Sequence, residues 1–351
     1  MKANFKEVGG LGAVAGNTAV IGLLAILALF LTVPQAFSQD LVIIMLPSGV
    51  TDVQIQQTLD ALPKGGGEVI LPPEKILIRQ PVVLRRDNQT LRGSGTKTIL
   101  RLADNANCPV LILGEPVNHP QKTVKHLRIA DLFIDGNRRN QQRELWQLSG
   151  EGSEIRNNGI TVQSVSDSTV ENVTCAACRS GGLVTTLDVT RLTVRGLTAF
   201  DNQFDGLACY HTTYSVFSDL YLHDNPGAGI SLDLAFDHNV ISNAFLAGND
   251  LGIFMRASRD NQFHNVTIND SHHFGVFMAH AEQFTAGGVR PAPESECTQN
   301  AFTNLIAKNC GGAAFRVNNS TCVNNVIIRP RFDGNLKGGL SQPQPDLVTV
   351  Q

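Results

Sequence analysis

Residues suited to acid–base chemistry recur at one position of a repeating unit. Tyr210, Asp233 and Arg256 each stand four residues after a glycine of the repeat, and His211 directly follows the tyrosine. A phenol, a carboxylate, a guanidinium and an imidazole can together transfer protons and neutralise an anionic group. On consecutive rungs of a sheet they would span about 10 Å, the size of one or two sugar rings. We therefore expect a catalytic site, although an Asp beside an Arg also fits a surface ion pair worth ~0–1 kcal/mol.

The elements that must position these residues are predicted by the glycines themselves, which divide residues 158–280 into units of 23 or 24 residues. The series consists of Gly159, Gly182, Gly206, Gly229, Gly252 and Gly275. Apolar residues come mostly at the first and third positions after each glycine, as Ile230 and Leu232 do. This alternation is typical of a short strand with one buried face. The second and fourth positions, which carry the candidate site, should therefore point outward.

A second signal recurs midway through each unit, an Asn, Asp or Gly followed by an apolar residue. Asn172 and Asn265 are examples, and the signal continues upstream to Asp131 and downstream to Asn325. Units this short leave no room for a helix and cannot bury an apolar face alone, so they must stack. The sequence thus predicts an all-β solenoid of about ten coils, in which columns of asparagines bond from coil to coil.

Composition and charge exclude some classes of function. The chain has 351 residues, a formal net charge of −3 and an isoelectric point near 6.3, and its charges are spread out. Proteins that bind nucleic acid carry a basic patch, so no nucleic-acid partner is expected here. Because a solenoid grows by adding coils, the length favours one elongated domain, which we expect to be a monomer.

The first 38 residues have the features of a secretory signal peptide. Lys2 and Lys6 precede an apolar run over residues 19–33, and small residues follow where a signal peptidase would cut. The run is shorter than the roughly 20 residues needed to span a bilayer. Residues 1–38 are therefore predicted to direct the chain to a secreted or periplasmic location, without stable membrane association after cleavage. An uncleaved N-terminal anchor is the alternative.

The two ends of the array are predicted to differ from its middle. Thr51 to Gln54 match a helix capping box, and apolar residues follow at helical spacing until Pro63. An N-terminal cap is physically required, because the open end of a stacked sheet exposes unpaired backbone groups. We expect an N-terminal cap with a short helix over residues 39–80, the solenoid over 81–335, and a polar C-terminal tail over 336–351.

Two polar segments are too long for simple turns and must form insertions. Residues 137–158 and residues 281–298 lie on either side of the coils from 159 to 275 and should wall a groove. The first insertion holds Trp146 and Arg139, which suit stacking on a sugar ring and pairing with a carboxylate. A tryptophan that packs its own loop down is the alternative.

Four further polar residues are candidates for substrate binding, namely Asp205, Asp237, His273 and His280. Asp237 falls at a turn, where aspartate is also common for local hydrogen bonding. Calcium would need several convergent oxygens, and only Asp233 and Asp205 can be placed together from the sequence. No metal or other cofactor is therefore predicted, and Ca²⁺ is the alternative.

Seven cysteines leave at least one thiol unpaired, and export would permit disulfides without requiring them. Cys209 occupies an inward strand position and is predicted to be buried. Cys175 and Cys178 have the spacing of a metal or redox pair, but no second such pair or nearby histidine completes a zinc site. Ordinary packing or one disulfide is expected there.

These motifs resemble the right-handed parallel β-helix (pectate-lyase-like) superfamily over residues 50–335. That superfamily includes pectate lyases, polygalacturonases, alginate lyases and mannuronan C5-epimerases. The epimerases carry Tyr-Gly-Phe-Asp-Pro-His and, one coil later, Gly-Phe-x-x-Asp; residues 204–211 and 229–233 stand in these places. Asp233 matches in register, whereas His211 is displaced by one position. No Asp-Pro-His string occurs, and the catalytic motifs of polygalacturonases are absent.

The resemblance implies a single-stranded, right-handed parallel β-helix and a lyase or C5-epimerase acting on a uronic-acid-containing polysaccharide. Such an enzyme removes the C5 proton, which lies α to a carboxylate. Arg256 would neutralise that carboxylate, His211 or Tyr210 would transfer protons, and Asp233 would orient the histidine or bind the sugar. Two alternatives stay open. A glycoside hydrolase would use Asp233 with Asp205 or Asp237, and a non-catalytic protein would only bind polysaccharide.

Overall fold

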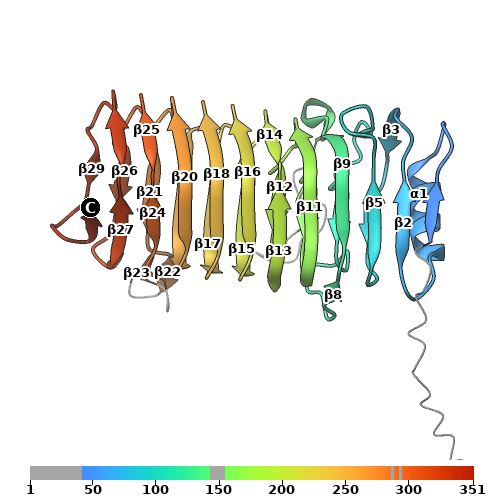
Figure 1. Cartoon of the computed structure of the whole chain (residues 1–351), viewed down its shortest axis with the longest axis horizontal. Helices are drawn as coiled ribbons and strands as arrows, with labels where there is room; N and C mark the ends of the chain where they lie inside the picture. The colour runs from blue at the N-terminus through green and yellow to red at the C-terminus, as the bar shows by residue number, and fades with distance from the viewer. Residues whose placement is uncertain (1–41, 143–154, 286–287, 292–294) are drawn as a thin grey trace, which may run out of the picture. The chain divides into compact units, whose positions relative to one another are not determined.

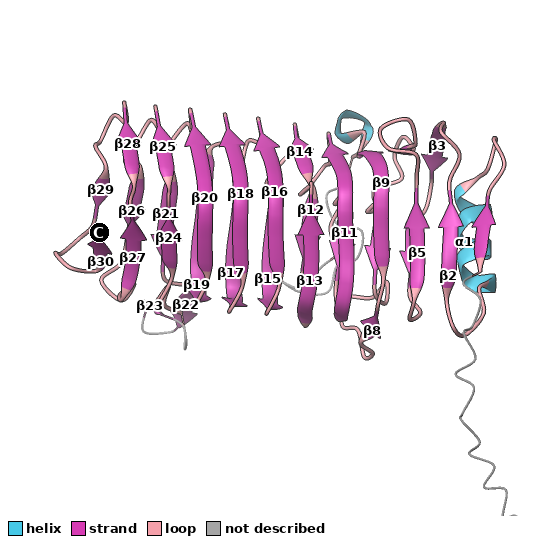
Figure 2. Ribbon diagram, in the orientation of Figure 1, coloured by secondary structure: helices cyan, strands magenta, loops and turns pink. Residues whose placement is uncertain are grey.

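The computed structural model describes residues 42–142, 155–285, 288–291 and 295–351 of the chain. These residues wind into a parallel β-helix of about 12 turns, which confirms the predicted solenoid with slightly more coils than expected (Figure 1). Within this part of the chain, helix is confined to α1 (Asp52–Ala61) and the short 3₁₀ helix η1 (Arg138–Asn140), as Figure 2 shows. The predicted signal peptide, residues 1–38, lies outside the described residues.

Each turn contributes strands to three faces, and each strand pairs in parallel with its equivalents on neighbouring turns. The first face contains β1 (Ile43–Met45), β2 (Gly67–Ile70), β5 (Gln89–Arg92), β9 (Arg128–Asp135), β11 (Val165–Ala176), β13 (Val189–Arg195), β16 (Val216–His223), β18 (Val240–Ala247), β20 (Gln262–Asn269), β24 (Ala301–Thr303), β27 (Asn325–Ile328) and β30 (Val348–Val350).

Several long strands continue from the first face onto the second. The second face is built from the later halves of β9, β11, β16, β18 and β20, together with β3 (Lys75–Ile78), β6 (Ile99–Leu102), β14 (Thr198–Phe200), β25 (Ile306–Lys308) and β28 (Arg331–Asp333).

The third face carries the strands that follow the repeating glycines. It contains β4 (Val82–Leu84), β7 (Leu111–Leu113), β10 (Ile160–Val162), β12 (Leu183–Thr185), β15 (Leu207–Thr213), β17 (Ala228–Asp237), β19 (Leu251–Arg259), β21 (Val276–Ala279), β26 (Phe315–Val317) and β29 (Leu340–Ser341). The short strand β8 (Val124–Lys125) pairs with β11. In the insertion after β21, β22 (Glu282–Thr285) and β23 (Gly288–Pro291) form an antiparallel hairpin.

The glycines of the repeat lie where the backbones of neighbouring turns approach closely. A Cβ atom on Gly182 would lie 2.5 Å from the carbonyl oxygen of Gly206, and one on Gly206 would lie 2.9 Å from that of Gly229. Real Cβ atoms do not tolerate such contacts with backbone, so glycine is needed here for steric reasons. The glycine spacing therefore sets the height at which each third-face strand begins.

The interior contains apolar side chains and ordered columns of asparagine. Ile230 and Leu232 are fully buried, as the alternation in the sequence predicts. One buried column consists of Asn202, Asn225 and Asn249, in which each side-chain oxygen accepts from the backbone N–H one turn earlier at 3.0–3.2 Å. A second consists of Asn239, Asn261, Asn300 and Asn325. These columns satisfy buried backbone donors at the corners of the coil.

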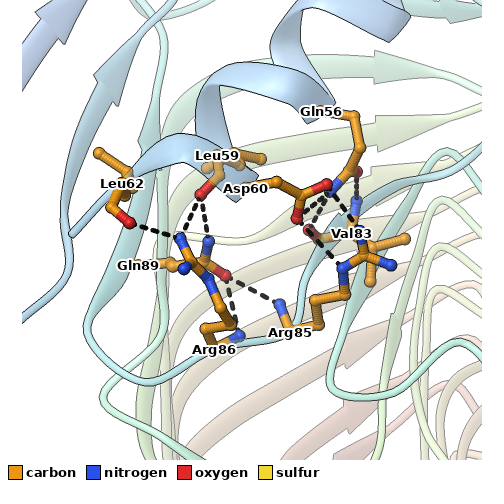
Figure 3. A network of polar contacts seen from close by, with 8 residues as sticks. All are labelled: Gln56, Leu59, Asp60, Leu62, Val83, Arg85, Arg86 and Gln89. Atoms are coloured by element: carbon orange, nitrogen blue, oxygen red, sulfur yellow. Dashed lines mark hydrogen bonds and ion pairs between the residues drawn. The ribbon is translucent and has the colours of Figure 1, made fainter. Parts of the chain in front are cut away.

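Helix α1 closes the N-terminal end of the coil. It contacts β2, β3 and β4, which belong to the three different faces. Its N-terminus has the predicted capping box between Thr51 and Gln54. At its C-terminus, Arg86 donates to the carbonyl oxygens of Leu59 and Leu62 at 2.9 and 2.8 Å, and Gln89 also donates to Leu59 (Figure 3). Carbonyls that the helix leaves without partners are thereby satisfied.

The C-terminal end differs from the prediction of a polar tail over residues 336–351. β29 pairs with β26, and β30 pairs with β27, so the ladders continue past residue 335. Leu347 and Val348 are buried there, which explains why this polar-looking segment still packs. No helix in the described ranges has both the length and the apolar character needed to cross a membrane.

Candidate functional site

The outer column predicted from the sequence lies on the third face. Tyr210 pairs with Asp233 on the next turn, and Asp233 pairs with Arg256 on the turn after that. Their strands β15, β17 and β19 are held in register by the glycines that precede them, so the three side chains stack at the rise of a parallel ladder, about 4.8 Å per turn. The structure thus brings these three residues together as the spacing requires.

Asp233 and Arg256 form an ion pair with several hydrogen bonds. The arginine Nε donates to both carboxylate oxygens, at 3.0 Å to Oδ1 and 2.9 Å to Oδ2, and Nη2 donates to Oδ2 as well. The Asp233 side chain is 3% exposed and that of Arg256 is 40% exposed. Asp233 is therefore buried, whereas alternation alone predicts an exposed side chain, because the arginine of the next turn covers it.

Burial and pairing act on the Asp233 carboxyl group in opposite directions. Burial raises the pKa of Asp233, while the hydrogen bonds and positive charge of Arg256 oppose this rise. The hydrogen bonds to Asp233 in turn raise the pKa of Arg256, so the guanidinium keeps its charge. Breaking such a pair would leave an uncompensated buried charge, which is strongly unfavourable.

Tyr210 lies among charged groups at the lower end of the column. Burial raises the pKa of the Tyr210 phenol, the negative charges of Asp205 and Asp233 raise it further, and Arg156 and Arg256 lower it. The phenol therefore stays protonated at neutral pH and can donate a hydrogen bond.

Asp205 adds a second carboxyl group to this environment. Its Oδ1 accepts a hydrogen bond from the backbone N–H of Ala228 at 2.7 Å. Burial raises the pKa of Asp205 to about 6, and the charge of Asp233 adds to the rise. Asp205 can thus gain or lose a proton near neutral pH, which suits an acid or a base.

The backbone is strained directly after Asp233. Leu234 and Ala235 both have positive φ angles, +48° and +67°, although neither is a glycine. The register with β15 and β19 shifts here, so β17 contains a bulge with one additional residue. The N–H of Leu234 donates to Asp233 Oδ1 at 2.8 Å and helps to fix the carboxylate. Bulges and left-handed residues of this kind are enriched beside active sites.

His211 lies beside the column but is not hydrogen-bonded to it. It occupies a left-handed corner position, with φ +44°, immediately after Tyr210. There it lines a shallow cavity of about 390 Å³ together with Asp188, Thr213 and Ala235. Its charge, when present, lowers the pKa of Asp233, so the two side chains are within electrostatic reach.

The other predicted binding residues lie in separate local pairs. Asp237 pairs with Arg259 at 2.9 Å, and His273 pairs with Asp250 at 2.6 Å. His280 contacts the turn above it, where its Nδ1 lies 3.2 Å from the hydroxyl of Thr321.

The predicted residues of the first insertion do not join the column either. Arg139 is exposed in η1, and no printed contact of η1 within the described residues reaches Tyr210, Asp233 or Arg256. Trp146 lies outside the described residues, so its predicted role in stacking on sugar stays a prediction.

Aromatic residues that sequence reasoning missed lie on the same face. Phe254 and Phe277 occupy the outward second position after their glycines, and their rings stack with centroids 6.0 Å apart. The Arg256 guanidinium lies 5.9 Å from the centroid of Phe254, and the Arg156 guanidinium lies 5.3 Å from that of Phe204. The alternation that placed Arg256 could have placed Phe254 and Phe277 as well, but only ionisable outward residues were considered.

No group of three or more His, Cys, Asp or Glu side chains converges as metal ligands within the described ranges. The acids of the third face are instead engaged with an arginine, as Asp233 is, or with a backbone N–H, as Asp205 is. These residues therefore do not fit a calcium site, and the chemistry considered below uses side chains alone.

Stacked parallel turns with ionisable groups on one outer face define a parallel β-helix protein. Residues 135–245 and 160–290 match the family described as "Right handed beta helix region", so the chain has the right-handed form of this fold. No curated protein sequence matches the chain at a significant level.

Solved structures show the same fold at low sequence identity. The ORF18 protein of Geobacillus virus E2 is 14% identical with a TM-score of 0.60, and the match covers 86% of this chain and 59% of that one. The family 28 exopolygalacturonase of Yersinia enterocolitica is 12% identical with a TM-score of 0.59, over 89% of this chain and 78% of that one. A mutant of the periplasmic alginate epimerase AlgG is 12% identical with a TM-score of 0.50, over 88% and 82%.

Proposed function

We propose that the chain is an exported, polysaccharide-active β-helix protein, and that it acts as a lyase or C5-epimerase on a uronic-acid-containing polysaccharide. The observation that carries this proposal is the column of Tyr210, Asp233 and Arg256 on consecutive turns, with the strained bulge beside it. Structural neighbours named for alginate and polygalacturonate enzymes support the polysaccharide class. Fold likeness at this identity does not choose the reaction.

Arg256 is suited to bind the carboxylate of a uronic acid. Its Nε and Nη2 bond to Asp233, and Nη1 takes no part in those bonds. Because the side chain is 40% exposed, this remaining edge can donate to a substrate carboxylate. Removal of the C5 proton places more negative charge on that carboxylate, so Arg256 would bind the transition state more tightly than the substrate.

Proton transfer would use the groups on either side of the substrate carboxylate. His211 or the phenolate form of Tyr210 would accept the C5 proton, and Asp233 would hold Arg256 in place. In a lyase, a protonated group such as the Tyr210 phenol would then donate to the departing glycosidic oxygen. In an epimerase, a proton would return to C5 from the opposite face.

A glycoside hydrolase is the second candidate, and Asp205 is the observation that favours it. The pKa of Asp205 is raised to about 6, whereas Asp233 is paired with a permanently charged arginine. Two carboxyl groups whose environments separate their protonation states are the usual apparatus of glycosidases. In that reaction Asp205 would be the acid and Asp233 the ionised partner.

One experiment separates these reactions. The secreted protein is incubated with alginate, polygalacturonate and other uronans. Ultraviolet absorbance reports the unsaturated product of a lyase, NMR reports inversion at C5, and new reducing ends without unsaturation report hydrolysis. We expect Tyr210→Phe and Arg256→Gln each to lower the activity by about 100-fold or more.

Arg259→Gln is the matched control, because Arg259 lies on the same strand and pairs with Asp237. It should keep most of the activity if Arg256 has a special role. Equal losses in both variants would contradict the proposed site. Polymer binding with no product from any uronan would instead assign the protein to the non-catalytic class.

A further inference from the structure

The insertion between β21 and β24 is fastened at its beginning to a loop of the following turn. This loop, residues 318–324, connects β26 to β27. His280, the last residue before the insertion, donates its backbone N–H to the side-chain oxygen of Asn319 at 3.2 Å. Its ring nitrogens lie 3.2 Å from the Thr321 hydroxyl and 3.3 Å from the Asn319 amide nitrogen.

The end of the insertion is fastened to the same loop by two cysteines. The thiols of Cys297 and Cys322 are hydrogen-bonded to each other, and the Cys322 sulfur also accepts from the backbone N–H of Cys297. Cys297 further donates to the carbonyl oxygen of Ala279 at 3.3 Å, next to the start of the insertion. Both cysteines are fully buried, so the two sulfurs are held together by the packing around them.

We propose that Cys297 and Cys322 form a disulfide that locks this insertion to the loop 318–324 when the chain folds under oxidising conditions. The inference rests on the contact between the two thiols and on the shared loop, and it does not depend on the proposed polysaccharide activity. Among the other cysteines, Cys310 bonds instead to Ser271, so it offers no equivalent pairing.

The chemistry is a thiol–disulfide exchange with a small disulfide such as glutathione disulfide. The hydrogen bond from Cys297 lowers the pKa of Cys322, and burial raises that of Cys297, so Cys322 supplies the attacking thiolate. Cys322 attacks one sulfur of glutathione disulfide and releases one glutathione. Cys297 then attacks the mixed disulfide and releases the second. Two cysteines are oxidised, and one glutathione disulfide is reduced to two thiols.

The bond would fix a segment that begins beside the candidate site. Glu282 is the first residue of β22, and its negative charge raises the pKa of Arg256, so the root of the insertion lies within electrostatic reach of the column. With His280 bonded at one root and a disulfide at the other, both ends of the insertion would be tied to one loop.

The test is to refold the full chain in a glutathione redox buffer, alkylate the remaining thiols and map the peptides by mass spectrometry. We expect one cross-linked peptide pair that contains Cys297 and Cys322, with the mass of two hydrogens lost. The oxidised protein should melt several degrees higher than the reduced protein, because the cross-link restricts the unfolded chain.

Cys322→Ser should abolish the cross-link and the rise in melting temperature, while the buried Cys310→Ser should keep both. The mapping of the wild-type protein needs no variant, so it stays decisive if Cys322→Ser fails to fold. Full alkylation of Cys297 and Cys322 in protein refolded under oxidising conditions would overturn the proposal. A cross-link confined to Cys175 and Cys178 would overturn it equally.

Discussion

At the scale of single residues, Asp205 is the group whose ionisation should most visibly affect stability. Its pKa is raised to about 6, chiefly by burial, so the folded protein holds the proton more tightly than the unfolded chain does. Stability is then highest below the unfolded pKa, near 4, and falls as the pH rises to about 6. Above that pH the loss is complete.

Asp205→Asn should remove this pH dependence. The asparagine oxygen can still accept from the N–H of Ala228, but the side chain no longer ionises. We expect the stability of the variant relative to wild type to increase by about 1–3 kcal/mol between pH 4 and pH 7. Urea unfolding at several pH values measures this, with the exposed Asp188→Asn as control. A difference that does not change with pH would contradict the assigned environment of Asp205.

At the scale of the strands, the asparagine columns differ by their burial. Asn249 is fully buried; it accepts from the backbone N–H and side chain of Asn225, at 3.0 and 2.9 Å, and donates to Leu222 at 2.9 Å. Asn243 belongs to an outer column and bonds to the side chains of Asp219 and Asn265 while exposed to solvent. Water can replace the partners of Asn243 but not those of Asn249.

Asn249→Ala should therefore lower the free energy of unfolding by about 2–4 kcal/mol, because it leaves buried donors and an acceptor unsatisfied. Asn243→Ala should cost only about 1 kcal/mol, mostly because its φ of +53° disfavours alanine. Denaturant unfolding of the two variants makes the comparison. Equal costs would mean that the buried column is not what stabilises the corners.

The strands also show what the sequence could and could not predict. The repeating glycines predicted the order and register of the third face, because steric contact between turns leaves no other residue there. The bulge in β17 was hidden, since 24 residues separate Thr212 from its partner Phe236, and 22 separate Phe236 from Ser258. The excess on one turn cancels the deficit on the next, so the glycine spacing does not change.

The candidate site was predicted in position but not in environment. Alternation placed Tyr210, Asp233 and Arg256 on one outer column, which the ladder confirms. It could not predict that Asp233 is buried, because the covering groups come from other turns. The contributions of Asp205 and Phe254 likewise depend on contacts between turns, which spacing along the chain does not reveal.

At the scale of the whole β-helix, each turn packs only on its neighbours, so the ends need separate protection. Helix α1 protects the N-terminal end with Ile55 and Leu59, which are both fully buried. Val53 lies on the same helix but is 57% exposed. The helix therefore has one face that covers the coil and another that contacts water.

Ile55→Asp should displace α1 and expose the apolar end of the coil. We expect a loss of stability of at least 2–5 kcal/mol, the range for removing a large buried side chain, together with self-association. Val53→Asp should change neither property. Urea unfolding and analytical ultracentrifugation measure the two effects. If Ile55→Asp is as stable and monodisperse as Val53→Asp, the helix does not serve as the cap.

The glycines at the start of each third-face strand have a consequence for how such a protein can evolve. A duplicated segment that runs from one of these glycines to the next carries the same backbone shape at both junctions, so it can insert as a complete turn. Each such duplication would lengthen the outer surface by about 4.8 Å. The length of polymer that fits along that surface can then be adjusted in discrete steps by unequal recombination, without new packing having to be invented.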